Sequence, residues 1–80
     1  MHVKCHFFAI YRDLVGCDEL ELEMPNGVTV DDLLSRVRSI DGGGDLPPQL
    51  AVAVNLEYVG GGHRLQDGDE VAFIPPVAGG

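Results

Sequence analysis

Apolar residues follow a helical period in only one long segment of this chain, and strand-like segments lie on both sides of it. The helical stripe consists of Val30, Leu33, Leu34, Val37 and Ile40. Thr29 and Asp32 have the spacing of a capping box, so the pattern predicts one main helix that begins after Thr29 and runs to about Ile40. A single amphipathic helix has to bury its stripe against strands, which favours an α+β fold.

The strand-like segments show two-residue periodicity or short apolar runs. Strands are predicted at residues 3–10, 19–24, 50–55, 57–59 and 71–74, with one helical turn at 11–16. In the first strand, Val3, Cys5, Phe7 and Ala9 share one face, and Lys4, His6, Phe8 and Ile10 share the other. Residues 41–48, rich in glycine and proline, are expected to be a flexible connection.

The order of elements is strand, strand, helix, strand, short strand, strand. The connection before the last strand is long enough to place that strand beside the first. We therefore predict a β-grasp topology, with a mixed sheet packed on one main helix. The predicted domain spans residues 1–74, and residues 75–80 form a flexible, reactive C-terminal tail.

Size and charge restrict the function. Eighty residues make one small domain, which leaves no room for a separate catalytic lobe, so a self-contained enzyme is not expected. Thirteen acidic and five basic residues give a formal charge of −8, which disfavours nucleic acid and favours a protein partner with a basic face.

Neither a membrane span nor an export signal is recognisable, so we expect a cytoplasmic protein with free thiols at Cys5, in the core, and Cys17, in a turn. His63 has no cysteine or second histidine at ligand spacing. No metal site and no bound cofactor are expected.

The tail contains no charged side chain after Glu70 and ends in Gly79-Gly80. Pro75 and Pro76 should stop the last strand and extend the chain as an arm. Glycines without Cβ atoms can thread a narrow cleft and present the terminal carboxylate. Once adenylated, that carboxylate would be an acyl donor to a thiol, sulfide or amine.

Strand parity also predicts a docking surface. If Phe7 and Phe73 face the helix, then Phe8 and Ile74 lie on the uncovered face, close together if the first and last strands pair, and Tyr58 could join them. An exposed apolar patch beside the root of a reactive tail is typical of a partner-binding surface.

Several motifs together point to one family: Phe7-Phe8-Ala9, Arg12-Asp13-Leu14-Val15-Gly16, Ala53-Val54-Asn55, Leu65 and residues 67–80. In these motifs the chain resembles the small, sulfur-carrying subunits of molybdopterin synthase, the MoaD family within the ThiS/MoaD ubiquitin-like group. It covers essentially the whole chain, and the ending Pro75-Pro76-Val77-Ala78-Gly79-Gly80 is its specific part.

The resemblance implies a β-grasp fold and a mechanism centred on Gly80. An adenylyltransferase related to ubiquitin-activating enzymes would use ATP to adenylate Gly80, and a sulfur donor protein would convert it to a thiocarboxylate. The thiocarboxylate would then enter the large synthase subunit and give its sulfur to a pterin precursor. Together with the patch, the resemblance gives the expected partner-binding residues as Phe8, Arg12, Tyr58, Ile74, Pro75, Pro76, Val77 and Ala78.

Three alternatives share the fold and the tail. The chain could be a sulfur carrier for thiamine or cysteine synthesis, or a ubiquitin-like modifier whose Gly80 forms isopeptide bonds with lysines. A plain interaction module with an inert tail is the third, but it leaves the terminal motif unexplained.

Overall fold

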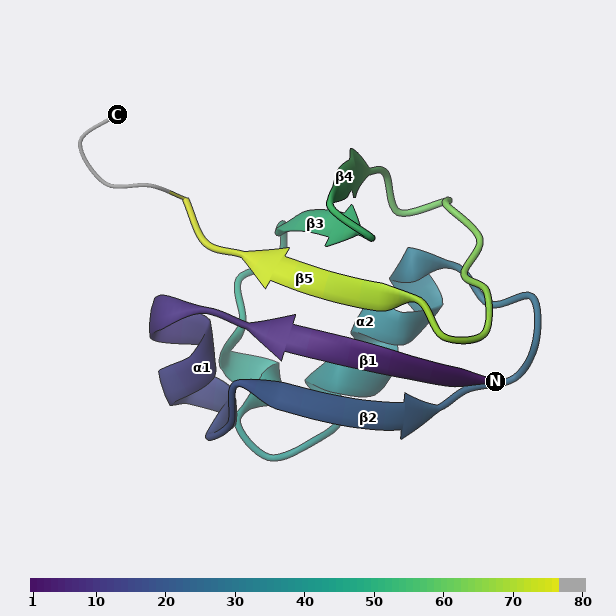
Figure 1. Cartoon of the computed structure of the whole chain (residues 1–80). Coiled ribbons are helices and arrows are strands. Elements are labelled where there is room, and N and C mark those ends of the chain that lie inside the picture. The colour runs from purple at the N-terminus through teal and green to yellow at the C-terminus, as the bar shows by residue number, and fades with distance from the viewer. Residues whose placement is uncertain (77–80) are drawn as a thin grey trace.

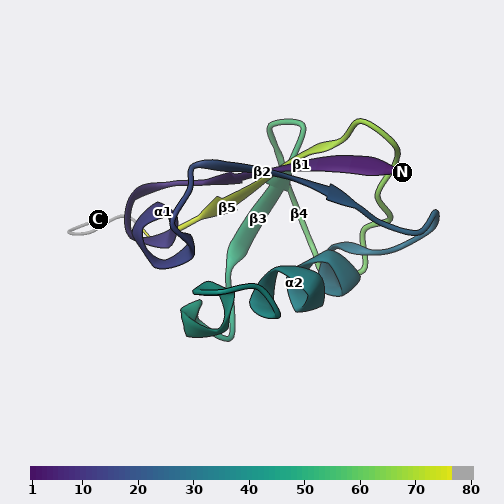
Figure 2. The ribbon, with the colours of Figure 1, turned by 90° about the horizontal axis from the view of Figure 1, so that it is seen from below.

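A five-stranded sheet and two helices make up residues 1–76, which are the residues that the computed structural model describes (Figure 1). In chain order the elements are β1 (His2–Phe7), α1 (Ala9–Val15), β2 (Glu19–Glu23), α2 (Val30–Arg38), a 3₁₀ turn (Gly43–Asp45), β3 (Ala51–Val54), β4 (Glu57–Val59) and β5 (Glu70–Ile74). Figure 2 shows α2, and α1 at one end, on the same side of the sheet.

The strand order is β2-β1-β5-β3-β4. β1 pairs antiparallel with β2 and parallel with β5, whereas β3 pairs antiparallel with both β5 and β4. The prediction of a mixed sheet with the last strand beside the first is therefore confirmed. β5 ends at Ile74, directly before Pro75 and Pro76, as expected from the missing amide hydrogens of proline.

The core lies between the sheet and α2. β1 and β5 alternate as predicted, and their fully buried side chains are Val3, Cys5, Phe7, Val71 and Phe73. The rings of Phe7 and Phe73 stack with centroids 5.3 Å apart. From α2, Val30, Leu33 and Val37 pack against this layer, which accounts for the helical stripe in the sequence.

The capping box at the start of α2 is confirmed. The Asp32 amide donates to Thr29 Oγ1 at 3.3 Å, and the Thr29 amide donates to Asp32 Oδ2 at 2.9 Å. The Thr29 amide, and then the Thr29 hydroxyl that also donates to Asp32 Oδ2, stabilise the charged carboxylate and lower the pKa of Asp32. The helix ends at Arg38, two residues before the predicted Ile40. The Ser39 and Ile40 amides instead donate to the carbonyls three residues earlier, Arg36 and Val37, in the tighter 3₁₀ pattern.

The first predicted strand is too long. β1 stops at Phe7, and Phe8 takes an extended conformation as the N-cap of α1. The predicted alternation therefore does not continue, and Ala9 and Ile10 are both exposed. The predicted single turn is instead a helix of seven residues, closed by Gly16 at φ +92°. Burial of Tyr11 decides this outcome, because a helix carries its ring back under the sheet whereas a longer strand would not.

The glycine-rich connection after α2 is packed, contrary to the prediction of a flexible loop. A Cβ atom on Gly42 would overlap the carbonyl of Leu14, and one on Gly43 would overlap the carbonyl of Val37. Arg38 also donates to the carbonyls of Leu46 and Pro47. The glycines are needed here for close approach of backbones, a requirement that composition alone does not distinguish from flexibility.

Candidate functional site

One row of cross-strand neighbours runs over the uncovered face of the sheet, with one residue from each strand. In strand order the row is Glu19, His6, Ala72, Ala53 and Tyr58. The two alanines occupy neighbouring strands, so the surface is low there and rises on both sides, at His6 and at Tyr58. Small residues between large ones thus produce a depression in the middle of the sheet.

This depression, the apolar groove, has a volume of about 470 Å³. Its apolar lining is Phe8, Ala53, Leu56, Tyr58, Ala72 and Ile74, and its polar lining is His6, Asn55 and Glu70. Phe8 is 50% exposed and Tyr58 72% exposed. The structure therefore brings together Phe8, Tyr58 and Ile74 on the uncovered face, as strand parity predicted.

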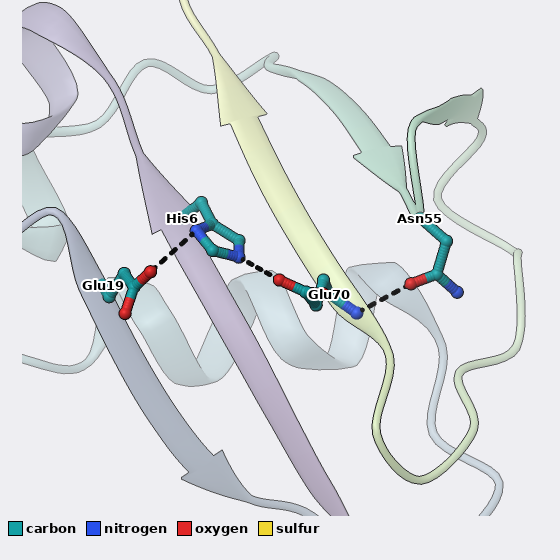
Figure 3. Close-up of polar contacts among 4 residues, drawn as sticks. All are labelled: His6, Glu19, Asn55 and Glu70. Atoms are coloured by element: carbon teal, nitrogen blue, oxygen red, sulfur yellow. Dashed lines mark hydrogen bonds and ion pairs between the residues drawn. The ribbon is translucent and has the colours of Figure 1, made fainter.

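His6, Asn55 and Glu70 of the groove lining form a connected polar network with Glu19 (Figure 3). His6 Nε2 lies 2.8 Å from Glu70 Oε1, and His6 Nδ1 lies 3.6 Å from Glu19 Oε1. The Glu70 amide donates to Asn55 Oδ1 at 3.0 Å. The network links β2, β1 and β5 to the turn between β3 and β4, and it gives the groove an acidic margin.

The base of the predicted arm adjoins the groove. Pro75 and Pro76 line a second depression together with Tyr58 and Ile74, which also line the apolar groove. The two surfaces are therefore continuous. The remaining predicted arm residues, Val77, Ala78, Gly79 and Gly80, lie outside the described residues.

Arg12 is set apart from the apolar groove. It lies on α1, is exposed, and its Nε is 3.9 Å from Asp13 Oδ1. Arg12 and Phe8 line a separate, smaller depression at the end of β1. Phe8 thus borders both surfaces, and Arg12 belongs only to the second.

Leu56 is a groove residue that the sequence analysis missed. It is 99% exposed and follows Asn55 in the two-residue turn that joins β3 to β4. The sequence did indicate an exposed turn at this position, because Leu56 lies between the two predicted strands 50–55 and 57–59 and follows an asparagine, a residue that favours hairpin turns. Ala53 and Ala72 were also missed, because they contribute to the groove only by their small size, which leaves the surface low between His6 and Tyr58.

The remaining titratable candidates do not gather into a site. Cys5 and Cys17 are free thiols, as expected, and burial raises the pKa of Cys5 to about 12, with a smaller contribution from Cys17. Among residues 1–76, no group of three His, Cys, Asp or Glu side chains could hold a metal ion. Over the same residues, none of the helices has the length and apolar character that crossing a bilayer requires.

Together, the mixed sheet, the single main helix and the groove beside the C-terminal strand define a β-grasp protein of the ubiquitin-like class. The family model described as "ThiS family" matches residues 5–80. The chain belongs to the ThiS family.

Named relatives align with all or nearly all of the chain. It is 41% identical to the molybdopterin synthase sulfur carrier subunit of Escherichia coli K12, over 98% of this chain and 99% of that protein. It is 37% identical to the protein of the same name from Chlamydomonas reinhardtii, over all of both chains. It is also 32% identical to small archaeal modifier protein 3 of Haloferax volcanii, again over all of both chains.

Solved structures agree with this fold. The putative molybdopterin converting factor subunit 1 of Pyrococcus furiosus aligns with a TM-score of 0.85 and 33% identity, over 96% of this chain and 99% of that one. A chain in the BexX/CysO complex of Amycolatopsis orientalis aligns with a TM-score of 0.72 and 28% identity, over 98% and 99% of the two chains.

Proposed function

We propose that this protein is a sulfur carrier in molybdenum cofactor biosynthesis. It would serve as the non-catalytic, sulfur-donating subunit of molybdopterin synthase. The observation that carries the proposal is the continuity between the apolar groove and the base of the arm at Pro75 and Pro76. Full-length similarity to two sulfur carrier subunits supports this choice over other roles of the fold.

The chemistry requires only the carboxylate of Gly80 from this chain. An adenylyltransferase would join that carboxylate to AMP from ATP, with release of pyrophosphate. The terminal sulfur of a persulfide would then attack the acyl carbon and expel AMP, and a second thiol would cleave the S–S bond to leave a thiocarboxylate. Transfer of the sulfur to the pterin precursor, with water supplying an oxygen, would regenerate the carboxylate.

The large subunit would supply the pterin pocket and the acid–base groups. By holding the thiocarboxylate next to its acceptor, the complex would replace free sulfide with a tethered reagent of high effective concentration. Phe8, Tyr58 and Ile74 would bury their exposed apolar surface against that subunit, and Arg12 would contact it from the neighbouring depression. The relative solved within a two-protein complex supports a protein partner.

The experiment is intact-mass analysis of the chain purified from its native cells. We expect the mass increase of one oxygen-to-sulfur exchange, located to Gly80 by fragmentation. The thiocarboxylated chain, mixed with the large subunit and pterin precursor, should then form the dithiolene product. A chain that forms the complex but yields no dithiolene would contradict the proposal.

A second candidate is a protein modifier, which the 32% identity to an archaeal modifier protein favours. Ala78→Asp separates the two roles. A carrier must bury the uncharged arm in its partner, where an unpaired carboxylate costs several kcal/mol, so dithiolene formation should collapse. Ser35→Asp, on the exposed side of α2, adds the same charge as a control. Abundant lysine adducts of this chain without dithiolene product would favour the modifier.

A further inference from the structure

The turn between β3 and β4 has an unusual backbone for its sequence. Asn55 has φ +49° and Leu56 has φ +73°, so both central residues of this two-residue turn are left-handed. Asparagine accepts this conformation, and glycine normally occupies the second position. A leucine there is strained, because its Cβ crowds the neighbouring carbonyl oxygen.

Leu56 gains nothing inside the protein in return for this strain. The residue is 99% exposed, so its side chain buries almost no apolar surface against the core. A single exposed leucine is common on protein surfaces, but one that also occupies the left-handed region is not. Strain of this kind is characteristically found at binding and switch sites.

The turn is also held firmly in place. The Asn55 amide donates to the Glu70 carbonyl at 2.8 Å, the Glu70 amide donates to Asn55 Oδ1 at 3.0 Å, and Asn55 Nδ2 donates to Asp69 Oδ1 at 3.0 Å. Glu70 is itself bonded to His6 in the network of Figure 3. The backbone of Leu56 is thus fixed beside the apolar groove, so little ordering remains to be done on binding.

We propose that Leu56 is a preorganised anchor that inserts into an apolar recess of the partner that receives the arm. This inference rests on the proposed function, since it concerns the same binding event. The recess should be flanked by Lys or Arg, because Glu57 follows Leu56 and Glu70 lines the groove, whereas no Lys or Arg among residues 1–76 lines it.

Continuity of the surface identifies this occupant. Leu56 and Tyr58 line the groove, and Tyr58 also lines the depression at Pro75 and Pro76. One partner can therefore cover the turn, the groove and the base of the arm together. A second copy of this chain is disfavoured, since each copy has a formal charge of −8 and would present the same acidic margin.

The test compares stability with binding in Leu56→Gln and Leu56→Gly. Gln retains the left-handed strain and should leave the melting temperature unchanged, whereas Gly should raise it by about 2–5 °C. Both variants should bind the recombinant large synthase subunit from the same organism at least ~5-fold more weakly by calorimetry. A Leu56→Met variant, which keeps an apolar side chain, should bind within about twofold of the unchanged protein.

Ile10→Gln is the control, because Ile10 is 58% exposed on α1 and does not line the groove. It should bind like the unchanged protein. Binding of both Leu56 variants as tight as that of the unchanged chain, with dithiolene formation intact, would overturn the anchor and leave the proposed function standing. If the unchanged chain forms no complex with the large subunit, the proposed function and the anchor are both refuted.

Discussion

Phe7 and Phe8 are neighbours in sequence that should differ sharply in what their loss affects. Phe7 is 1% exposed and stacks on Phe73, whereas Phe8 is 50% exposed at the rim of the apolar groove. Phe7→Ala would leave a cavity in the core and should lower the free energy of unfolding by about 3–5 kcal/mol. Phe8→Ala removes a ring that is already half in water and encloses no cavity, so its cost should be about 1 kcal/mol.

These losses are large relative to the total free energy of unfolding of the protein. At roughly 0.05–0.15 kcal/mol per residue, a chain of 80 residues has a total stability of about 4–12 kcal/mol. Phe7→Ala could therefore unfold the protein, and Phe7→Leu, which should cost about 1 kcal/mol, keeps the comparison possible. Urea denaturation gives the stabilities, and a common slope for all variants would show that the unfolded states are comparable.

Binding should rank the variants in the opposite order. Phe8→Ala should weaken association with the large subunit by roughly 5- to 150-fold, the range expected of a central interface anchor, and Tyr58→Ala and Ile74→Ala should fall in the same range. Phe7→Leu, once folded, should bind almost normally. If Phe8→Ala binds normally while Phe7→Leu does not, the assignment of the two faces of the sheet to core and docking surface is refuted.

Three further predictions concern the scaffold. Gly43→Ala should lower the free energy of unfolding by about 1–3 kcal/mol because its Cβ would overlap the Val37 carbonyl, whereas Gly44→Ala, with 3.7 Å to the nearest backbone oxygen, should be nearly neutral by denaturation. Asp32→Asn should lower the melting temperature at neutral pH, and equal melting temperatures of the two proteins would contradict this prediction. Because folding lowers the pKa of Asp32, the stability that its carboxylate contributes should decline as the pH falls below the ordinary value of 3.8. At about pH 8, iodoacetamide should alkylate Cys17 in the native protein but spare Cys5 until denaturant is added, as mass spectrometry would detect.

The sequence was most informative where periodicity and burial coincide. Val3, Cys5 and Phe7 alternate because one face of β1 is buried against α2, so the faces of the sheet were predictable. Prediction failed at Ala9 and Ile10, where alternation in the sequence continues but the chain turns into a helix to bury Tyr11. The conformation of Ala9 and Ile10 is therefore tied to a tertiary contact, the burial of Tyr11, which local propensity does not encode.

The apolar groove was likewise predictable only in part. Phe8, Tyr58 and Ile74 were predictable as exposed apolar residues, but the depression between them depends on Ala53 and Ala72 standing side by side on β3 and β5. That pairing depends on strand register, which hydrophobic patterning alone did not supply. The strain at Leu56 likewise appears only in the backbone angles.

Parallel pairing of β1 with β5 places Pro75, the base of the predicted arm, beside the apolar groove. β1 and β5 run in the same direction (Figure 1). Because Phe7 lies opposite Phe73, Phe8 and Ile74 follow at the same edge of the sheet, and Pro75 comes directly after Ile74. In an antiparallel pair, the last strand would instead end beside His2, at the opposite edge from Phe8. The proposed carrier function would therefore depend on topology as well as on side chains, because this arrangement would let a single partner hold the groove and receive the predicted arm that follows β5.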